Sequence, residues 1–325
     1  MYIVLISLTL LISFFLAVLI GLIIIPILKR KKINQNLSIY LEERHASKKN
    51  TPTMGGIIFI MSSLITILVL IILKRITFSN NFLIVLFVLI SYALIGFIDD
   101  FLIIKRNSNN GLTELTKLLF QIIIAIIFFL LFLQENEPLI WIQPLHLKLD
   151  IGWYYGLFIL FILVASSNAV NLTDGLDGLA TGLAIIAFMT FGIITYFTGW
   201  LEGYESISLL CFVVAGSLLG FLTFNIYPAK IFMGDTGSLS LGATLGTVSI
   251  LTRHELLLIV IGIVFVVETM TCLIQRYYYK LTHKRIFPMA PIHHTFEKMG
   301  WNEQNIVRLF WLVGLIGALI ALILR

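Results

Sequence analysis

The sequence predicts an all-α integral membrane protein of about ten transmembrane helices, with active-site loops on the cytoplasmic side and a short external hairpin. Of the 325 residues, 59% are hydrophobic and only 12% are charged, about half the charged share of ordinary soluble domains. The mean hydropathy is +1.02. Because one crossing takes about 20 apolar residues, ten crossings use roughly 200. This composition excludes a soluble globular fold and a disordered chain, and it predicts a single polytopic membrane domain over residues 1–325.

The apolar runs give the positions of the helices. The first run has no basic segment before it and no small-residue cleavage site, so we interpret it as a span and not as a cleaved signal. The eighth run is short and rich in Gly, Ser and Thr, which favours close packing between helices. The ten predicted spans are 2–25, 55–73, 81–102, 115–134, 153–170, 179–198, 206–224, 238–252, 256–279 and 305–324.

The distribution of positive charge orients these spans. The loops that follow odd-numbered spans, with the adjoining helix ends, carry 17 Lys and Arg residues, and the other side carries 5. Since Lys and Arg are enriched in cytoplasmic loops, we expect the first loop in the cytoplasm and both termini outside. The net charge of +5 therefore reflects topology and indicates no nucleic-acid partner. Among the external loops, 138–152 alternates apolar and polar residues near its end, which predicts the hairpin.

Acidic residues are also distributed unevenly between the two sides. Ionisable residues near a bilayer are costly and mark functional sites by default. The external acids are scattered, whereas five cytoplasmic aspartates stand at or near helix ends. They are Asp99, Asp100, Asp174, Asp177 and Asp235. This concentration predicts a functional site on the cytoplasmic side.

Two of the cytoplasmic motifs carry opposite charges. The Asp99–Asp100 pair ends the third span, and adjacent carboxylates favour a divalent metal, a base or a nucleophile. Mg²⁺ usually binds a few carboxylates together with substrate phosphates. Lys48 and Lys49 precede Thr51-Pro52-Thr53-Met54-Gly55-Gly56 and supply positive charge for phosphate. The alternatives are an ordinary acidic helix end and a positive-inside anchor.

Three further motifs are rich in glycine or histidine. The loop 168–182 places Asn171, Asp174 and Asp177 among glycines, and 225–238 contains Gly234-Asp235-Thr236-Gly237-Ser238. A carboxylate, hydroxyls and backbone N–H groups at a helix start suit a metal–phosphate site, and an N-cap is the alternative. The third motif, 288–297, contains adjacent histidines that suit phosphate better than zinc. Before it, Glu268 and Gln275 share one helix face, and Glu268 should face the bundle interior.

In this order, the five motifs resemble the polyprenyl-phosphate N-acetylhexosamine-1-phosphate transferase superfamily, from about Lys48 to Trp311. Pro288-Met289-Ala290-Pro291-Ile292-His293-His294 is most similar to the branch that transfers phospho-N-acetylmuramoyl-pentapeptide. The resemblance implies a Mg²⁺-dependent transfer of phospho-MurNAc-pentapeptide from UDP-MurNAc-pentapeptide to undecaprenyl phosphate. The products would be UMP and lipid I for peptidoglycan synthesis, made in the bacterial inner membrane.

The resemblance also implies roles for individual residues. Asp235 is the expected Mg²⁺ ligand, and Asp99 and Asp100 are expected to act as base, nucleophile or further metal contacts. Lys117 and the catalytic His293 are expected to contact phosphates. The uracil is expected near Leu176, Asp177 and Phe232, and the lipid phosphate is expected to enter from the membrane plane near the ninth helix. The remaining substrate-binding residues are Lys48, Thr53, Asn171, Asp174, Gly175, Asn225, Gln275 and His294.

Two positions depart from the family pattern, and several questions stay open. Ile103 stands where a lysine is usual, so Lys105 or Arg106 is a candidate replacement, and Thr295 stands where a third histidine is usual. An alternative function is a GlcNAc-1-phosphate transferase that serves another surface polymer. A proton-coupled transporter would place its acids at mid-membrane, where only Glu268 is expected. A one-step and a covalent two-step route both remain, and a homodimer is one possible assembly.

Overall fold

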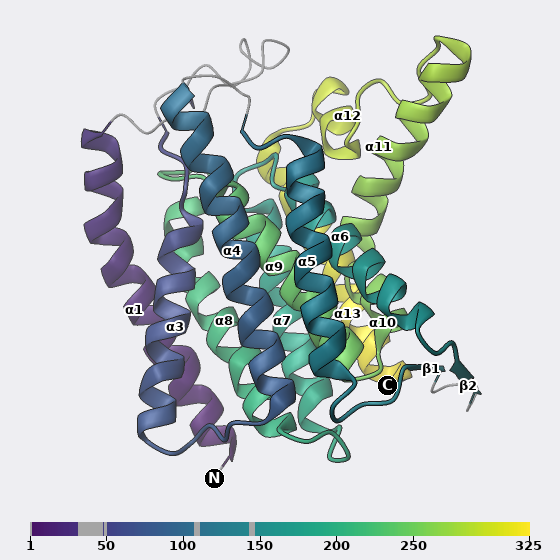
Figure 1. The fold of residues 1–325 in the computed structure, drawn as a ribbon. Coiled ribbons are helices and arrows are strands. Elements are labelled where there is room, and N and C mark those ends of the chain that lie inside the picture. The colour runs from purple at the N-terminus through teal and green to yellow at the C-terminus, as the bar shows by residue number, and fades with distance from the viewer. Residues whose placement is uncertain (1, 32–47, 49–50, 107–110, 143–146) are drawn as a thin grey trace.

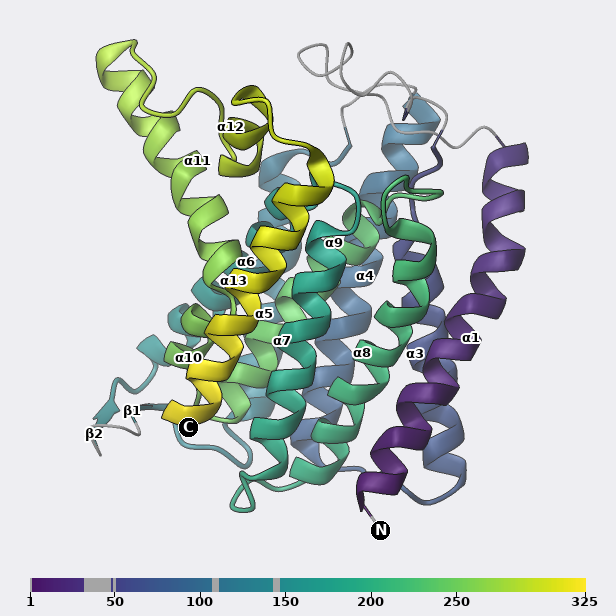
Figure 2. The same ribbon diagram turned by 180° about the vertical axis from the view of Figure 1, so that it is seen from behind.

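The polypeptide forms an elongated bundle of helices that run up and down between two ends (Figures 1 and 2). The computed structural model describes residues 2–31, 48, 51–106, 111–142 and 147–325. The helices in the described residues are α1 (Tyr2–Arg30), α3 (Gly56–Ile72), α4 (Asn80–Arg106), α5 (Glu114–Phe132), α6 (Tyr154–Thr173), α7 (Leu179–Tyr196), α8 (Tyr204–Asn225), α9 (Gly234–Leu251), α10 (Glu255–Ile261), α11 (Ile263–Thr282), α12 (Ile292–Lys298) and α13 (Glu303–Leu324).

The prediction of an all-α membrane protein is confirmed, because every predicted span coincides with one of these helices or with the α10–α11 pair. In the described part of the chain, seven helices are long and apolar enough to cross a membrane, or eight if the bent pair α10–α11 is one span. Helix α3, with 17 residues, is shorter than these, and α9 is not among them. The count of ten crossings therefore stays a prediction.

The ninth predicted span, 256–279, is not one straight helix. Helices α10 and α11 meet at Gly262 with a bend of 85°. Sharp bends of this kind form readily at glycine, where no side chain holds the turn. After the bend, α11 leans away from the other helices (Figures 1 and 2). The apolar side chains of Met270, Leu273 and Ile274 are consequently exposed on it.

Helix α9 lies inside the bundle, and small residues let its neighbours come close. From Thr236 to Leu251 all of its residues are buried. A Cβ atom at Gly242 would clash with the backbone of Ser166 in α6, and one at Gly56 would clash with the backbone of Gly237. Contacts between backbones without intervening side chains are typical of packed membrane helices. The predicted close packing of the eighth span is confirmed.

The two ends of the bundle differ. The predicted hairpin is present as β1 (Leu139–Ile142) and β2 (Leu147–Asp150), which are antiparallel, with Leu139 opposite Asp150. It lies at the same end as both termini, and we call this the hairpin end (Figure 1). The opposite end carries α12, the last turns of α4 and the start of α9, and we call it the aspartate end (Figure 1). Which end faces the cytoplasm stays a prediction.

Candidate active site

The five predicted aspartates meet at the aspartate end, on three parts of the chain. Asp99 and Asp100 belong to α4, Asp235 lies in the first turn of α9, and Asp174 and Asp177 belong to the loop between α6 and α7. Helices α4 and α9 approach closely here, because a Cβ at Gly96 would clash with the backbone of Asp235. The structure therefore brings together residues that are up to 136 positions apart in the sequence.

Asp100 caps the start of α9. Its carboxylate accepts hydrogen bonds from the Asp235 N–H at 3.0 Å and from the Thr236 N–H at 2.9 Å. The Thr236 hydroxyl donates a third bond at 2.6 Å. The first N–H groups of a helix lack partners within the helix, and a carboxylate stabilises them. Gly234 permits this approach with a left-handed φ of 75°, a conformation that glycine adopts without strain. Asp100 thus fixes the backbone that carries Asp235.

Lys117 joins Asp99 and Asp235. The Lys117 Nζ lies 3.0 Å from Asp99 Oδ2 and 2.9 Å from Asp235 Oδ2. Asp99 Oδ1 also accepts the Leu112 N–H at 2.6 Å, and the Asn171 amide donates to Asp235 Oδ1 at 2.8 Å. The Asp235 side chain is 23% exposed, whereas that of Asp99 is 3% exposed. Asp235 is therefore the more accessible carboxylate of the pair.

Asp174 adds a fourth carboxylate to this group. Burial raises the pKa of its carboxyl well above the usual range, and the negative charges of Asp235, Asp100 and Asp177 raise it further. The Gly234 N–H bond opposes this shift. Part of the side chain is nevertheless accessible to solvent. Asp174 therefore lies near enough to the other carboxylates for their negative charges to act on it, in addition to the larger effect of burial.

The first and fourth sequence motifs are joined by backbone hydrogen bonds. The Phe232 N–H donates to the Pro52 carbonyl at 2.8 Å, and the Gly55 N–H donates to the Phe232 carbonyl at 2.8 Å. Gly56 bonds in the same way to Met233. These bonds bring Thr53, which is buried, beside Gly234.

Lys48 and Asp177 form an ion pair at one side of this group. The Lys48 Nζ lies 2.7 Å from Asp177 Oδ1, and Asp177 Oδ2 accepts the Ala229 N–H at 2.9 Å. Lys48 lies equally close to Glu303, at 2.6 Å. Sequence reasoning missed Glu303, because an acid in the first turn of a helix is common and gave no other signal.

The two histidines are each paired with a glutamate. His293 is fully buried, and its Nδ1 lies 3.1 Å from Glu268 Oε2, which is also fully buried. The prediction that Glu268 faces the interior is confirmed. A Cβ at Gly175 would clash with the Nε2 edge of the His293 ring. His294 Nδ1 lies 2.6 Å from Glu297 Oε2. The pairing connects the histidine motif to α11 and to the 168–182 loop.

Other residues predicted to bind substrate have hydrogen-bond partners within the protein. The Asn225 side chain accepts from the Thr181 hydroxyl at 2.6 Å and donates to the Ile231 carbonyl at 3.0 Å. Gln275 Oε1 accepts the N–H groups of two loop residues, Ile286 and Phe287. Leu176 is buried. The structure gives Asn225 and Gln275 roles in shaping the loops, and it does not test their predicted contact with substrate.

The structure also describes the two positions that depart from the family pattern, Thr295 and Ile103. The Thr295 hydroxyl donates to the Met289 carbonyl at 2.5 Å and so ties the start of α12 to the preceding loop. Ile103 is half-buried, and the neighbouring Lys105 is exposed. The Arg106 guanidinium donates to the Gly111 carbonyl at 3.1 Å.

The predicted Mg²⁺ site can be compared with the donors present. Among the described residues, no three His, Cys, Asp or Glu side chains are arranged to hold a metal ion. Asp99 and Asp235 do provide two carboxylates, and both lie within hydrogen-bond distance of the Lys117 ammonium group. Mg²⁺ commonly takes one or two carboxylates and completes its shell with water and substrate phosphates. The donor set therefore fits Mg²⁺ that arrives with a phosphate ligand.

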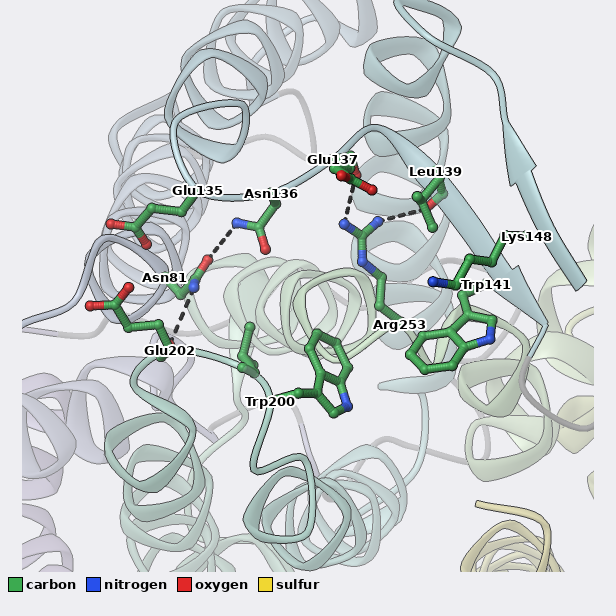
Figure 3. A pocket seen from close by; sticks show the side chains of 11 residues that line it. Asn81, Glu135, Asn136, Glu137, Leu139, Trp141, Lys148, Trp200, Glu202 and Arg253 are labelled. Atoms are coloured by element: carbon green, nitrogen blue, oxygen red, sulfur yellow. Dashed lines mark hydrogen bonds between the residues drawn. The ribbon is translucent and has the colours of Figure 1, made fainter. Parts of the chain in front are cut away.

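A polar cavity of about 360 Å³ lies at the hairpin end, far from these residues (Figure 3). The guanidinium of Arg253 and the indoles of Trp141 and Trp200 line it, and none of the predicted site residues does. Its acidic side chains, Glu135, Glu137 and Glu202, are spread around its rim (Figure 3). The cavity does not belong to the aspartate group.

Comparison with known proteins identifies similar sequences. The family model described as glycosyl transferase family 4 matches residues 82–253. The model described as phospho-N-acetylmuramoyl-pentapeptide-transferase signature 1 matches residues 48–60. Curated proteins named phospho-N-acetylmuramoyl-pentapeptide-transferase from Staphylococcus saprophyticus, Staphylococcus aureus and Staphylococcus epidermidis are 49%, 48% and 47% identical to this chain. Each match covers 92% of this chain and 93% of the relative.

Proposed function

Since the chain belongs to the phospho-N-acetylmuramoyl-pentapeptide transferase family and acts in lipid I synthesis, we propose that Asp99, Lys117 and Asp235 form its reaction centre. The donor is UDP-MurNAc-pentapeptide, the acceptor is undecaprenyl phosphate, and the products are lipid I and UMP. One observation carries this assignment. Lys117 Nζ bridges two carboxylates, at 3.0 Å and 2.9 Å, where α4, α5 and α9 meet.

The reaction joins two anions, so it needs positive charge at the centre. An oxygen of the acceptor phosphate attacks the donor phosphorus that carries the sugar, and the bond from that phosphorus to the UMP oxygen breaks. Lys117 is the protein cation placed to approach these phosphates. Asp235 and Asp99 would hold Mg²⁺, which when bound supplies neutralisation of the diphosphate charge. The protein's part is to align attacking and leaving oxygens and to stabilise charge.

The carboxylates have different roles in the proposed reaction. Asp100 acts through Asp235, since its three hydrogen bonds fix the start of α9. In direct attack, Asp99 or Asp235 takes the proton of the acceptor phosphate. In a two-step route, one of them attacks the donor first and carries the phosphosugar as an acyl phosphate. Incubation with the donor alone, with no acceptor present, would form this intermediate and release UMP in the two-step route, and neither product in direct attack.

We place the nucleotide beside the Lys48–Asp177 pair, with Gly175, Leu176 and Phe232 around the base. The polyprenyl chain must reach the centre from the membrane. The exposed apolar side of α11, including Met270, Leu273 and Ile274, supports an approach along that helix. The excess of Lys and Arg in the loops of the aspartate end supports a cytoplasmic active site, external termini and the inner membrane as location.

The test is release of UMP by the purified protein from UDP-MurNAc-pentapeptide, undecaprenyl phosphate and Mg²⁺. We expect turnover that stops with a chelator and returns with Mg²⁺. Turnover that a chelator leaves unchanged would remove Mg²⁺ from the proposal. UMP release from UDP-GlcNAc, without release from UDP-MurNAc-pentapeptide, would support the alternative function.

A further inference from the structure

Glu303, in the first turn of α13, connects two residues of the proposed nucleotide site. One of its oxygens, Oε1, lies 2.6 Å from Lys48 Nζ and accepts the Asp177 N–H at 2.7 Å. Lys48 and Asp177 are themselves 2.7 Å apart. A single carboxylate oxygen therefore holds both the side chain of Lys48 and the backbone of Asp177.

The start of α13 is itself firmly placed. Ile306 and Val307, one turn further on, are buried. The Trp311 indole N–H donates to the Leu179 carbonyl at 3.3 Å, at the beginning of α7. Since α7 begins two residues after Asp177, this bond anchors α13 next to the loop that Glu303 contacts. Residues 48, 177, 229 and 303, from four separate segments, are thereby joined in one network.

The network contains one cation and two carboxylates. The side chains of Lys48 and Glu303 are each 12% exposed, and that of Asp177 is 2% exposed. An ammonium group has three N–H donors, and Asp177 and Glu303 take two of those of Lys48. One donor is left, and its direction is set by the other two. Hydrogen bonds between charged partners in such shielded places are roughly twice as strong as neutral ones.

We propose that Glu303 is a positioning residue for the nucleotide end of the donor. It keeps Lys48 and the Asp177 loop in the arrangement that binds UDP-MurNAc-pentapeptide, and it does not touch the reacting phosphates. The inference rests on the proposed function. It adds a residue that lies outside the five sequence motifs and outside both matched family models, which cover 48–60 and 82–253.

The test is steady-state kinetics of Glu303→Ala and Glu303→Gln. Glu303→Ala removes the acceptor of both bonds, so we expect the KM for UDP-MurNAc-pentapeptide to rise about 10- to 100-fold. The kcat and the KM for undecaprenyl phosphate should stay within about threefold. The lost interaction holds the donor equally in the ground state and in the transition state, so its removal weakens binding and does not slow the chemical step. Glu303→Gln keeps an oxygen acceptor for the Asp177 N–H and should recover part of the affinity. The matched control is Gln304→Ala, at the exposed next position.

A double-mutant cycle with Lys48→Met separates positioning from general stability. We expect Glu303→Gln to raise the donor KM much less in the Lys48→Met background than alone, because the two residues act through one contact. Additive effects would overturn the inference, as would a donor KM of Glu303→Ala equal to wild type. A fall in kcat with equal changes in both KM values would also overturn it. If wild-type protein fails to use this donor, the proposed function itself fails.

Discussion

The two ends of the bundle both bury charged side chains, but only in the buried network of the hairpin end does one cation face one carboxylate. There, the Arg253 guanidinium donates to the Leu139 and Glu137 carbonyls at 2.5 and 2.6 Å (Figure 3). The same guanidinium donates to the Tyr155 hydroxyl at 3.1 Å. It also lies 5.0 Å from the centre of the Phe132 ring. The Tyr155 hydroxyl in turn donates to Glu255 at 2.9 Å. The cation has a partner on each side and ties α5, α6, α10 and the hairpin together.

In the buried network of the aspartate end, by contrast, carboxylates outnumber the cations that contact them. Lys117 is shared by Asp99 and Asp235, and Lys48 is shared by Asp177 and Glu303. Asp100 and Asp174 bring the carboxylates to six. Such an excess costs stability and is retained where function needs it. This difference indicates that the charged network of the hairpin end stabilises the fold, whereas that of the aspartate end can bind a cation and phosphates.

The largest effect is expected from Asp235→Asn. The amide keeps the size of the side chain but removes the accessible charge beside Lys117, so kcat should fall about 10³-fold or more. The thermal unfolding midpoint in detergent should fall only slightly, because the amide keeps an oxygen acceptor for Lys117 and loses only the charge of the ion pair. The matched control is Asp150→Asn, on the exposed strand β2 of the hairpin end. Full turnover by Asp235→Asn would break the assignment of this end to catalysis.

The reverse pattern is expected for Arg253→Met. Removal of one member of a buried charged network typically costs about 3–5 kcal/mol, since the remaining buried charge loses its compensation. Three carbonyl and hydroxyl oxygens would lose their donor here. Thermal unfolding should therefore begin at lower temperature, while kcat of the folded fraction stays near wild type. A stable Arg253→Met with impaired kcat would contradict the division between the two ends.

The positions of the helices were predictable because the length of an apolar run is a local property. The bend at Gly262 was not, because a single glycine is tolerated inside many helices. The aspartates were predictable for a related reason, since charge is scarce in this chain. Their distinct roles were not: neighbours on a helix point about 100° apart, but only the packing of α4 on α9 shows that Asp100 caps while Asp99 faces Lys117. Glu303 and the Glu268–His293 pair likewise depend on contacts between segments far apart in sequence.

A smaller effect, with a defined dependence on pH, is expected from Asp174→Asn. The folded protein holds the Asp174 proton more tightly than the unfolded chain, since the pKa is raised on folding. As pH rises above about 4, Asp174 loses its proton first in the unfolded chain. The free energy of unfolding of the wild type therefore falls with rising pH until the raised pKa of the folded state is passed. The variant lacks this loss. It should match the wild type in acid and exceed it in thermal stability at pH 7–8, without divalent cations.

Activity supplies the second half of this test. Because Asp174 belongs to the proposed substrate site, the more stable variant should also turn over more slowly. A variant less stable than the wild type at neutral pH would contradict the unfavourable burial of the Asp174 charge beside the other carboxylates. Asp150→Asn, changed in the same way at the hairpin end, should leave activity unchanged.

The smallest effect is expected from Lys148→Ala, in the cavity of the hairpin end. The Lys148 ammonium lies 5.0 Å from the centre of the Trp141 ring and is exposed to solvent. A cation over an aromatic ring at an exposed site contributes little, so the unfolding midpoint should shift by less than about 2 °C. UMP release should be unchanged, because the cavity shares no residue with the aspartate group. A tenfold loss of turnover would connect this cavity to catalysis and remove the contrast between an end that stabilises and an end that reacts.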